Sequence, residues 1–199
     1  MDLEYKLLGR NDCEGAINCI AESFFNKDSL SVALGISFND WVSFANGEVN
    51  RSIDENLSFC AIDEKIVGAL LAYDFLDYKP SNYILVDSFT PISKLMGELH
   101  EGYNVSDNVL HFSYIGVLLD YANKGVAHEM IIRNIDLAKN VGYRKIILEA
   151  TSPYSRKAVS KLGFKTVNEI FYKDFSYNGE KVFEDINSTP SCALMELEL

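Results

Sequence analysis

The chain has 199 residues, of which 48% are hydrophobic and 24% charged, a composition typical of a globular chain rather than a disordered tail. This length suits one domain, spanning 1–199, whose core needs no disulfide or metal to be stable. The 29 acidic residues outnumber the 18 basic ones, giving a net charge of −11. That charge disfavours nucleic acid or an anionic membrane as the main partner and is compatible with a cationic small molecule.

Three features of the sequence bear on its compartment. The longest apolar run, at 66–73, is far shorter than the roughly 20 residues of a bilayer span, and the acidic start lacks the basic region of a secretory signal. No C-x-x-C pair or zinc-like spacing with histidine occurs among the cysteines, which are Cys13, Cys19, Cys60 and Cys192. We therefore expect a cytoplasmic protein with reduced thiols, no membrane segment and no metal site.

The first half of the chain predicts strands and helices in alternation. Polar and apolar residues that alternate indicate half-buried strands, and apolar residues spaced by three and four indicate helices. Asn39 or Asp40 is expected to cap a helix, and Pro91 suits the first turn of another. The predicted elements are a strand at 3–8, a helix at 11–25, helical pieces within 30–50, hairpin strands at 56–63 and 65–74, and a helix at 91–103.

The second half gives stronger patterns. Gly142 is expected to end a long amphipathic helix. The predicted elements are a strand at 109–118, that helix at 125–141, a strand at 145–150, a short helix at 154–162, a long strand at 164–175 and a last strand at 192–199. This order predicts an α/β fold with one mixed sheet covered by helices on both faces.

The loop before the 125–141 helix has features of a phosphate site. Gly125 lets a ligand approach the backbone, the first N–H groups of the helix point outward, and Lys124 adds a positive charge. An ordinary strand-to-helix turn is the alternative on these residues alone. A nucleotide P-loop and a dinucleotide fingerprint are excluded, because neither G-x-x-x-x-G-K-[ST] nor G-x-G-x-x-G occurs in the chain.

About 38 residues after Gly125, the short helix ends in Lys161-Leu162-Gly163-Phe164. This helix, the preceding strand and the loop together resemble the GNAT superfamily of acyl-CoA-dependent N-acyltransferases, over roughly 110–164. In that family the loop motif is Q/R-x-x-G-x-G/A and binds the pyrophosphate of acetyl-CoA. Here the motif has Ala122 in place of the usual Arg or Gln and reads Ala122-Asn123-Lys124-Gly125-Val126-Ala127.

The resemblance implies where acetyl-CoA binds. The loop would hold the pyrophosphate mainly through backbone donors, which survive the change at Ala122. The strand before it would pair with the pantetheine through the main chain of Ile115 and Val117, with the family's bulge near Gly116. The implied cofactor residues are Ile115, Gly116, Val117, Ala122, Asn123, Lys124, Gly125, Val126, Ala127, Ser152 and Ser155.

The N-terminal half narrows the resemblance to one branch. The run at 22–30, Glu-Ser-Phe-Phe-Asn-Lys-Asp-Ser-Leu, is similar to the Phe-Phe-x-Asp-Glu-Pro-Leu segment of insect-type arylalkylamine (dopamine) N-acetyltransferases. Asp28 falls where that branch carries its catalytic Glu, and Thr151 and Ser155 fall on its two hydroxyl positions beside the thioester. The resemblance implies the GNAT fold, a central mixed and mostly antiparallel sheet of about seven strands flanked by helices on both faces.

The chemistry explains why a carboxylate matters. An alkylammonium titrates near 10.4, like lysine, so its deprotonation at pH 7 costs about 4.6 kcal/mol, and a general base offsets part of this cost. Asp28 is the candidate base, with a helix cap as its alternative role. The neutral amine then attacks the thioester, and backbone N–H near Val117 stabilises the oxyanion.

The thiolate that leaves needs a proton. Many GNAT enzymes use a Tyr four residues before the Gly of Lys-Leu-Gly-Phe, and that position is Val159 here. Ser155, and secondarily Thr151, is therefore the candidate donor, unless Ser155 only caps its helix.

His111 is a further catalytic candidate. A His occupies the equivalent strand position in vertebrate arylalkylamine N-acetyltransferases as one of a proton-relay pair, and the second position of that pair is Ser113 here. A lone strand His is more often a core residue. His100 and His128 have no sequence neighbours that suggest chemistry.

Together these features predict an N-acetyltransferase that uses acetyl-CoA and a small primary amine, with an arylalkylamine as the first expectation. The segment 29–44 has Asp40 as its only acid among many apolar residues, which favours an apolar slot over a channel for a polycation. The alternatives are a polyamine or other amine acetyltransferase, and a non-catalytic acyl-CoA-binding module. The aromatic residues expected to line the amine pocket are drawn from Trp41, Phe44, Phe75, Tyr78, Tyr83 and Tyr172.

Overall fold

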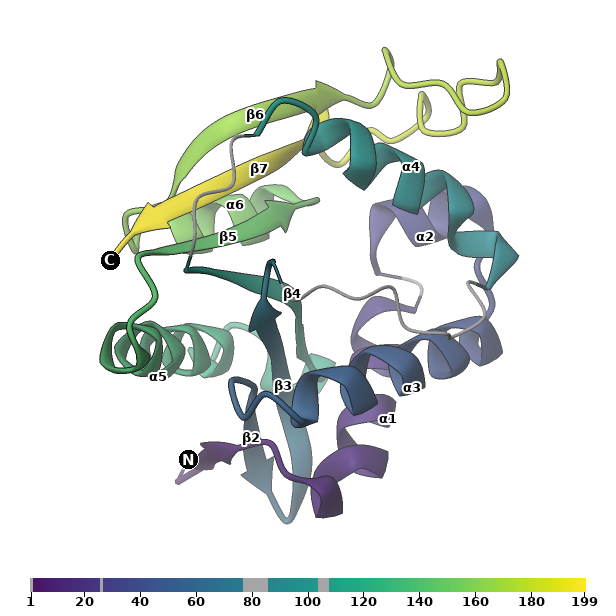
Figure 1. The fold of residues 1–199 in the computed structure, drawn as a ribbon. Helices are drawn as coiled ribbons and strands as arrows, with labels where there is room; N and C mark the ends of the chain where they lie inside the picture. Colours follow the sequence, from purple (N-terminus) through teal and green to yellow (C-terminus); the bar gives the residue numbers. More distant parts are fainter. Residues whose placement is uncertain (1, 26, 77–85, 104–107) are drawn as a thin grey trace.

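A computed structural model describes residues 2–25, 27–76, 86–103 and 108–199. Its seven strands are β1 (Glu4–Leu7), β2 (Phe59–Asp63), β3 (Lys65–Asp74), β4 (Val109–Val117), β5 (Lys145–Ala150), β6 (Lys165–Phe171) and β7 (Ser191–Glu198). They form one sheet in the order β1-β2-β3-β4-β5-β7-β6. All pairings are antiparallel except that of β4 with β5, so the predicted mixed, mostly antiparallel sheet is confirmed (Figure 1).

Helices cover both faces of this sheet. They are α1 (Cys13–Phe24), α2 (Ser29–Leu34), α3 (Phe38–Ile53), α4 (Thr90–Leu99), α5 (Val126–Val141) and α6 (Pro153–Ser160), with three short 3₁₀ turns at Arg10–Asp12, Asp87–Phe89 and Leu119–Tyr121. Figure 1 shows α5 on the opposite side of the sheet from α1 and α3. No helix in the described ranges is long and apolar enough to cross a membrane.

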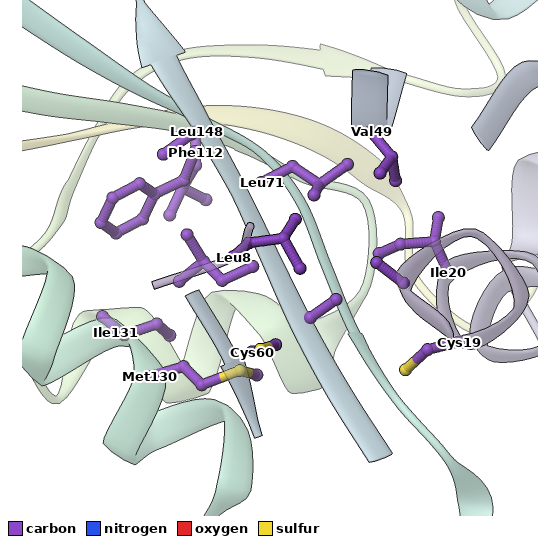
Figure 2. Packing of buried hydrophobic residues seen from close by; sticks show 14 of the residues in the cluster. Leu8, Cys19, Ile20, Val49, Cys60, Leu71, Phe112, Met130, Ile131 and Leu148 are labelled. Atoms are coloured by element: carbon purple, nitrogen blue, oxygen red, sulfur yellow. The ribbon is translucent and has the colours of Figure 1, made fainter. Parts of the chain in front are cut away.

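The core lies on both sides of the central strands. Figure 2 shows Met130 and Ile131 of α5 on one side of these strands and Cys19 and Ile20 of α1 on the other, and all four side chains are almost completely buried. Helix α5 follows its predicted pattern, with buried residues at helical spacing along one face. It ends at Gly142, which has the left-handed conformation (φ 95°) expected of a C-terminal stop.

The sequence-based expectations for the cap of α3 and the end of β6 are wrong. The cap of α3 is Ser37 rather than Asn39 or Asp40: its hydroxyl accepts from the Asp40 N–H at 3.1 Å, and Asp40 is its partner in a capping box. Strand β6 ends at Phe171 rather than near residue 175, because the chain turns there and the Phe175 N–H donates to the Phe171 carbonyl at 3.2 Å.

The bulge expected near Gly116 lies elsewhere. The β3–β4 register shifts between Leu71, which faces Tyr114, and Ala72, which faces Phe112, so Ser113 is the extra residue. Gly116 has a different reason to be glycine. A Cβ there would lie 3.0 Å from the Cβ of Ser23, so the missing side chain lets α1 pack closely against β4.

The pairing of β4 with β5 is short. It joins Val109–His111 to Lys145–Ile147, and beyond these three pairs the structure gives β4 the single partner β3. On the β3 side, the Leu118 N–H donates to the Val67 carbonyl at 2.9 Å. Because successive strand residues direct their backbone groups to alternate sides, the N–H groups of Ile115 and Val117 are directed toward the gap that β5 leaves.

Candidate active site

A cavity of about 720 Å³ opens where β4 and β5 diverge. Its wall comes from α1, α2, α3, α4, α6 and the strands β3, β4 and β5. The wall combines an aromatic surface with titratable and hydroxyl side chains. The titratable residues in it, apart from tyrosine, are Lys27, Asp28, Glu48, Arg51, His100, His111 and Glu149.

The aromatic surface is centred on Trp41. Its ring centroid lies 4.9 Å from Phe24 and 4.9 Å from Phe89, and Phe44 stacks on Phe89 at 4.3 Å. Tyr114 of β4 closes the group, 5.5 Å from Phe44. Such a surface accommodates a flat apolar ring.

Only some of the aromatic residues expected in this pocket line the cavity. Trp41, Phe44 and Phe75 line the cavity. Tyr172 lies outside it, in a second buried cluster with Phe175 and Phe183. Tyr78 and Tyr83 lie outside the described residues.

Asp28 lies in the cavity wall and caps α2. One carboxylate oxygen accepts from the Ser31 N–H at 3.0 Å and from the Ser31 hydroxyl at 2.8 Å. The other oxygen accepts from the Thr151 hydroxyl at 3.3 Å. Burial raises the pKa of Asp28, and the hydrogen bonds from Ser31 and Thr151 oppose this. The side chain therefore has the geometry of a cap together with an increased affinity for a proton.

Ser152 and Ser155 begin α6 as a capping box and also line the cavity. The Ser152 hydroxyl accepts from the Ser155 N–H at 3.1 Å, and the Ser155 hydroxyl donates to the Ser152 carbonyl at 2.9 Å. Val159 lines the same wall one turn further along. The structure thus places both expected hydroxyl residues, Thr151 and Ser155, on one cavity, and gives Ser155 a capping role as well.

His111 is not a lone histidine. Its Nε2 lies 2.9 Å from Oε2 and 3.0 Å from Oε1 of Glu149, and His100 Nε2 makes a second contact with the same carboxylate. A carboxylate only accepts hydrogen bonds, so each Nε2 carries its hydrogen. Burial raises the pKa of Glu149, but the two imidazoles outweigh this and hold it well below its ordinary value.

Sequence reasoning missed two members of this cluster. His100, at the C-terminal end of α4, lies 49 residues before Glu149, and nothing in the sequence connects them. Glu149 carried a usable signal, since it is a charged residue near the end of the otherwise apolar run Ile146-Ile147-Leu148. A buried carboxylate in a strand requires hydrogen-bonding partners.

The predicted phosphate loop lies at the start of α5, and its residues are not among those that line the cavity. Gly125 caps the helix in the left-handed conformation (φ 81°), and Asn123 is also left-handed (φ 59°). The Glu129 N–H donates to the Gly125 carbonyl at 3.0 Å. The N–H groups of the three residues between them therefore have no partner within the helix, which is the arrangement of an anion-binding helix start.

The loop also has room for a ligand. A Cβ on Gly125 would meet no atom within 4 Å, and Lys124 lies beside the ring of Tyr121, with Nζ 5.4 Å from its centroid. Ile115 and Val117, on the strand before this loop, line the cavity. The remaining loop positions, Ala122, Val126 and Ala127, contribute backbone rather than polar side chains. Within the described ranges, no group of three or more His, Cys, Asp or Glu side chains is arranged to hold a metal ion.

This chain is similar to known proteins both in sequence family and in fold. The model of the acetyltransferase (GNAT) family matches residues 29–164. The solved C-terminal condensation domain of Ebony, in complex with beta-alanyl-dopamine, is 20% identical, with a TM-score of 0.87 over 100% of both chains. Arylalkylamine N-acetyltransferase 2 from Aedes aegypti is 22% identical, with a TM-score of 0.82 over 100% of this chain and 99% of that one.

A third structure is the Drosophila melanogaster polyamine N-acetyltransferase, described as catalysing the formation of N-acetylagmatine. It is 17% identical, with a TM-score of 0.80 over 100% of both chains. At these identities the three likenesses show a shared fold.

We expect Glu149→Gln to destabilise the protein by about 2 kcal/mol at neutral pH, because an amide accepts hydrogen bonds from two imidazoles less well than a carboxylate does. The folded pKa of Glu149 is depressed, so its stabilisation is complete above the ordinary value of 4.5 and is lost as the pH falls below that value. Urea unfolding of both proteins at about pH 7 and about pH 3.5 should therefore give a smaller difference at the lower pH.

The matched control for this measurement is Glu129→Gln. Glu129 is an exposed residue that pairs with Arg133 on α5 at 2.8 Å, and an exposed pair contributes little to stability. A Glu149→Gln difference that stays constant between the two pH values would contradict the depressed pKa.

Proposed function

Because this chain belongs to the acetyltransferase (GNAT) family, we propose that it transfers the acetyl group of acetyl-CoA to a primary arylalkylamine bound in the cavity. The family match confirms the predicted superfamily, fold and enzyme class, an acetyl-CoA-dependent N-acetyltransferase. One observation carries the choice of acceptor: the Asp28 carboxylate and the aromatic surface around Trp41 line the same cavity. A carboxylate beside an aromatic surface suits an ammonium group on an aryl side chain.

The residues of the loop and of β4 fit acetyl-CoA. The free N–H groups after Gly125 would hold the pyrophosphate, and the backbone of Ile115 and Val117 would pair with the pantetheine in the gap beside β4. Ala122 leaves the binding to backbone donors and Lys124. Bound acetyl-CoA supplies the thioester that the amine attacks.

The proton transfers use residues that line the same cavity. Asp28 takes a first proton from the ammonium group and releases it to solvent, and the neutral amine forms the new C–N bond. As the C–S bond breaks, Asp28 takes the second proton that the nitrogen must lose to become an amide. The N–H of Val117 is directed into the gap, where it would stabilise the oxyanion. Ser155, with Thr151 as a relay to Asp28, would return a proton to the departing sulfur.

A polyamine is the second candidate acceptor, and a specific observation favours it. Asp40, the one acid in the segment 29–44, belongs to the capping box of α3 and not to the cavity wall. The cavity instead contains Glu48 and Glu149 in addition to Asp28. Spaced carboxylates are what a polycation requires, although Glu149 is already paired with two histidines.

The proposal also includes one catalytic domain over 1–199 and a cytoplasmic location. The four cysteines are free thiols, and free buried thiols are typical of a reducing compartment.

The proposed function predicts acetyl-CoA turnover with amines. We expect tyramine and tryptamine to be acetylated with a higher kcat/KM than spermidine, because the aromatic surface around Trp41 would bind an aryl ring. The measurement is release of the coenzyme A thiol with each amine. A clear preference for spermidine would replace the arylalkylamine with the polyamine, and binding of acetyl-CoA without thiol release would favour the non-catalytic module.

The phosphate loop is tested with Gly125→Asp. The added carboxylate would face the pyrophosphate at the helix start, and we expect acetyl-CoA binding to be lost in a folded protein. Gly142→Asp is the matched control, since Gly142 is a left-handed glycine at the other end of α5 with open space around it. Near-normal affinity of Gly125→Asp by titration calorimetry would rule out the phosphate site.

The base is tested with Asp28→Asn. Asn caps helices about as well as Asp, so this change keeps the start of α2 and removes the proton acceptor. We expect kcat/KM to fall about 10²-fold while acetyl-CoA affinity stays nearly unchanged. Normal turnover at neutral pH would mean that Asp28 serves only as a cap.

A further inference from the structure

Helix α3 presents a continuous stripe of aromatic and charged side chains to the cavity. Trp41, Phe44, Glu48 and Arg51 are spaced by three or four residues, so they follow one face of the helix, and all four line the cavity. Trp41 and Phe44 form part of the aromatic surface, with ring centroids 5.7 Å apart. Glu48 is the first charged side chain along this stripe after the aromatic rings.

The Glu48 carboxylate is largely buried, yet in the part of the chain that the structure describes no hydrogen-bond donor reaches it. Its nearest cation is Arg51, whose Nη1 lies 3.8 Å from Oε1, beyond hydrogen-bonding distance. The Arg51 guanidinium lies over the ring of Tyr73, 3.5 Å from its centroid. Because a carboxylate forms strong hydrogen bonds and Glu48 lines the cavity, its oxygens are open acceptors for a donor on a bound ligand.

The stripe also indicates how Asp28 and Glu48 are arranged along the cavity. The Asp28 N–H donates to the Phe24 carbonyl at 3.0 Å, and the Phe24 ring lies 4.9 Å from Trp41, so the Asp28 end of the cavity is the Trp41 end of α3. Glu48 follows Trp41 by seven residues, a rise of about 10 Å along the helix. An arylalkylamine with its nitrogen at Asp28 and its ring against Phe44 directs the far edge of that ring toward Glu48.

From this arrangement, which rests on the proposed function, we propose that Glu48 is a specificity-determining residue that accepts a hydrogen bond from a phenolic hydroxyl on the ring of the acceptor. The preferred substrates are then hydroxylated arylalkylamines, of which tyramine is the simplest. Asp28 binds the amine end, the aromatic surface binds the ring, and Glu48 selects the hydroxyl.

A second ammonium group is the other donor that Glu48 could accept. Arg51 already places a positive charge 3.8 Å from the Glu48 carboxylate, and a further cation at the same position would be repelled by it. A phenolic hydroxyl supplies the missing donor without adding charge. Its ring also packs against Phe44 and Phe89, which the charged chain of a diamine does not need.

The test compares tyramine with phenethylamine, which lacks only the hydroxyl, on the same preparation of each enzyme. We expect the wild-type kcat/KM for tyramine to be about 10–100-fold higher, as for a hydrogen bond to a charged acceptor. Glu48→Gln, which keeps the shape and one acceptor oxygen, should reduce this ratio several-fold, and Glu48→Ala should bring it to about 1. Glu98→Gln should keep the wild-type ratio, because Glu98 pairs with Lys94 at 3.3 Å and is not among the residues that line the cavity.

Because each ratio compares two amines on one protein, a loss of folded enzyme cancels. A wild-type ratio near 1, or an unchanged ratio in both Glu48 variants, overturns the role of Glu48 and leaves the N-acetyltransferase assignment standing. Absence of acetyl transfer to any amine overturns the proposed function itself. Putrescine separates the two donors: a Glu48→Ala variant that loses more kcat/KM for putrescine than for tyramine would show that the subsite takes an ammonium.

Discussion

The short parallel pairing between β4 and β5 is the constraint on which the site depends. After three residue pairs the two strands separate, and the extra residue Ser113 changes the course of β4 at the same level. The gap serves two purposes at once. It leaves the outward N–H groups of Ile115 and Val117 without a strand partner, and it opens a cavity lined by both strands. A fully paired sheet would have neither an edge for an extended ligand nor space for an amine.

Polar groups at a gap in a sheet need hydrogen-bonding partners. The carboxylate of Glu149 finds them in two histidines. Its carboxylate lies at the separation point and is held by His111 from β4 and His100 from the end of α4. Because α4 contributes part of the cavity wall, these contacts fix that wall to the sheet. Asn168 of β6 adds a second tie, donating to the Leu99 carbonyl at 2.6 Å. The buried charge therefore positions a helix as well as lining the cavity.

The sequence predicted most of the fold because the patterns involved are local. The α5 helix, its stop at Gly142 and the left-handed Gly125 follow from periodicity and backbone preferences. Asp28, Thr151 and Ser155 were found through a family resemblance, and the structure brings all three to one cavity. Glu149 and His100 come together through contacts between distant segments, which a local pattern does not encode. The stripe on α3 was nevertheless present in the sequence, as acidic and basic side chains that continue an aromatic face at helical spacing.

Asp28 shows how a structural and a chemical role support one another. As the cap of α2, its carboxylate is fixed in one orientation by the N–H and hydroxyl of Ser31, so a base in this position needs little reorganisation before it accepts a proton. The same hydrogen bonds favour the charged form, whereas burial favours the neutral one, and burial prevails in raising the pKa. A surface cap with the same bonds would be a weaker base. The location of the cap inside the cavity wall, rather than the identity of the residue, therefore makes Asp28 suitable for proton transfer.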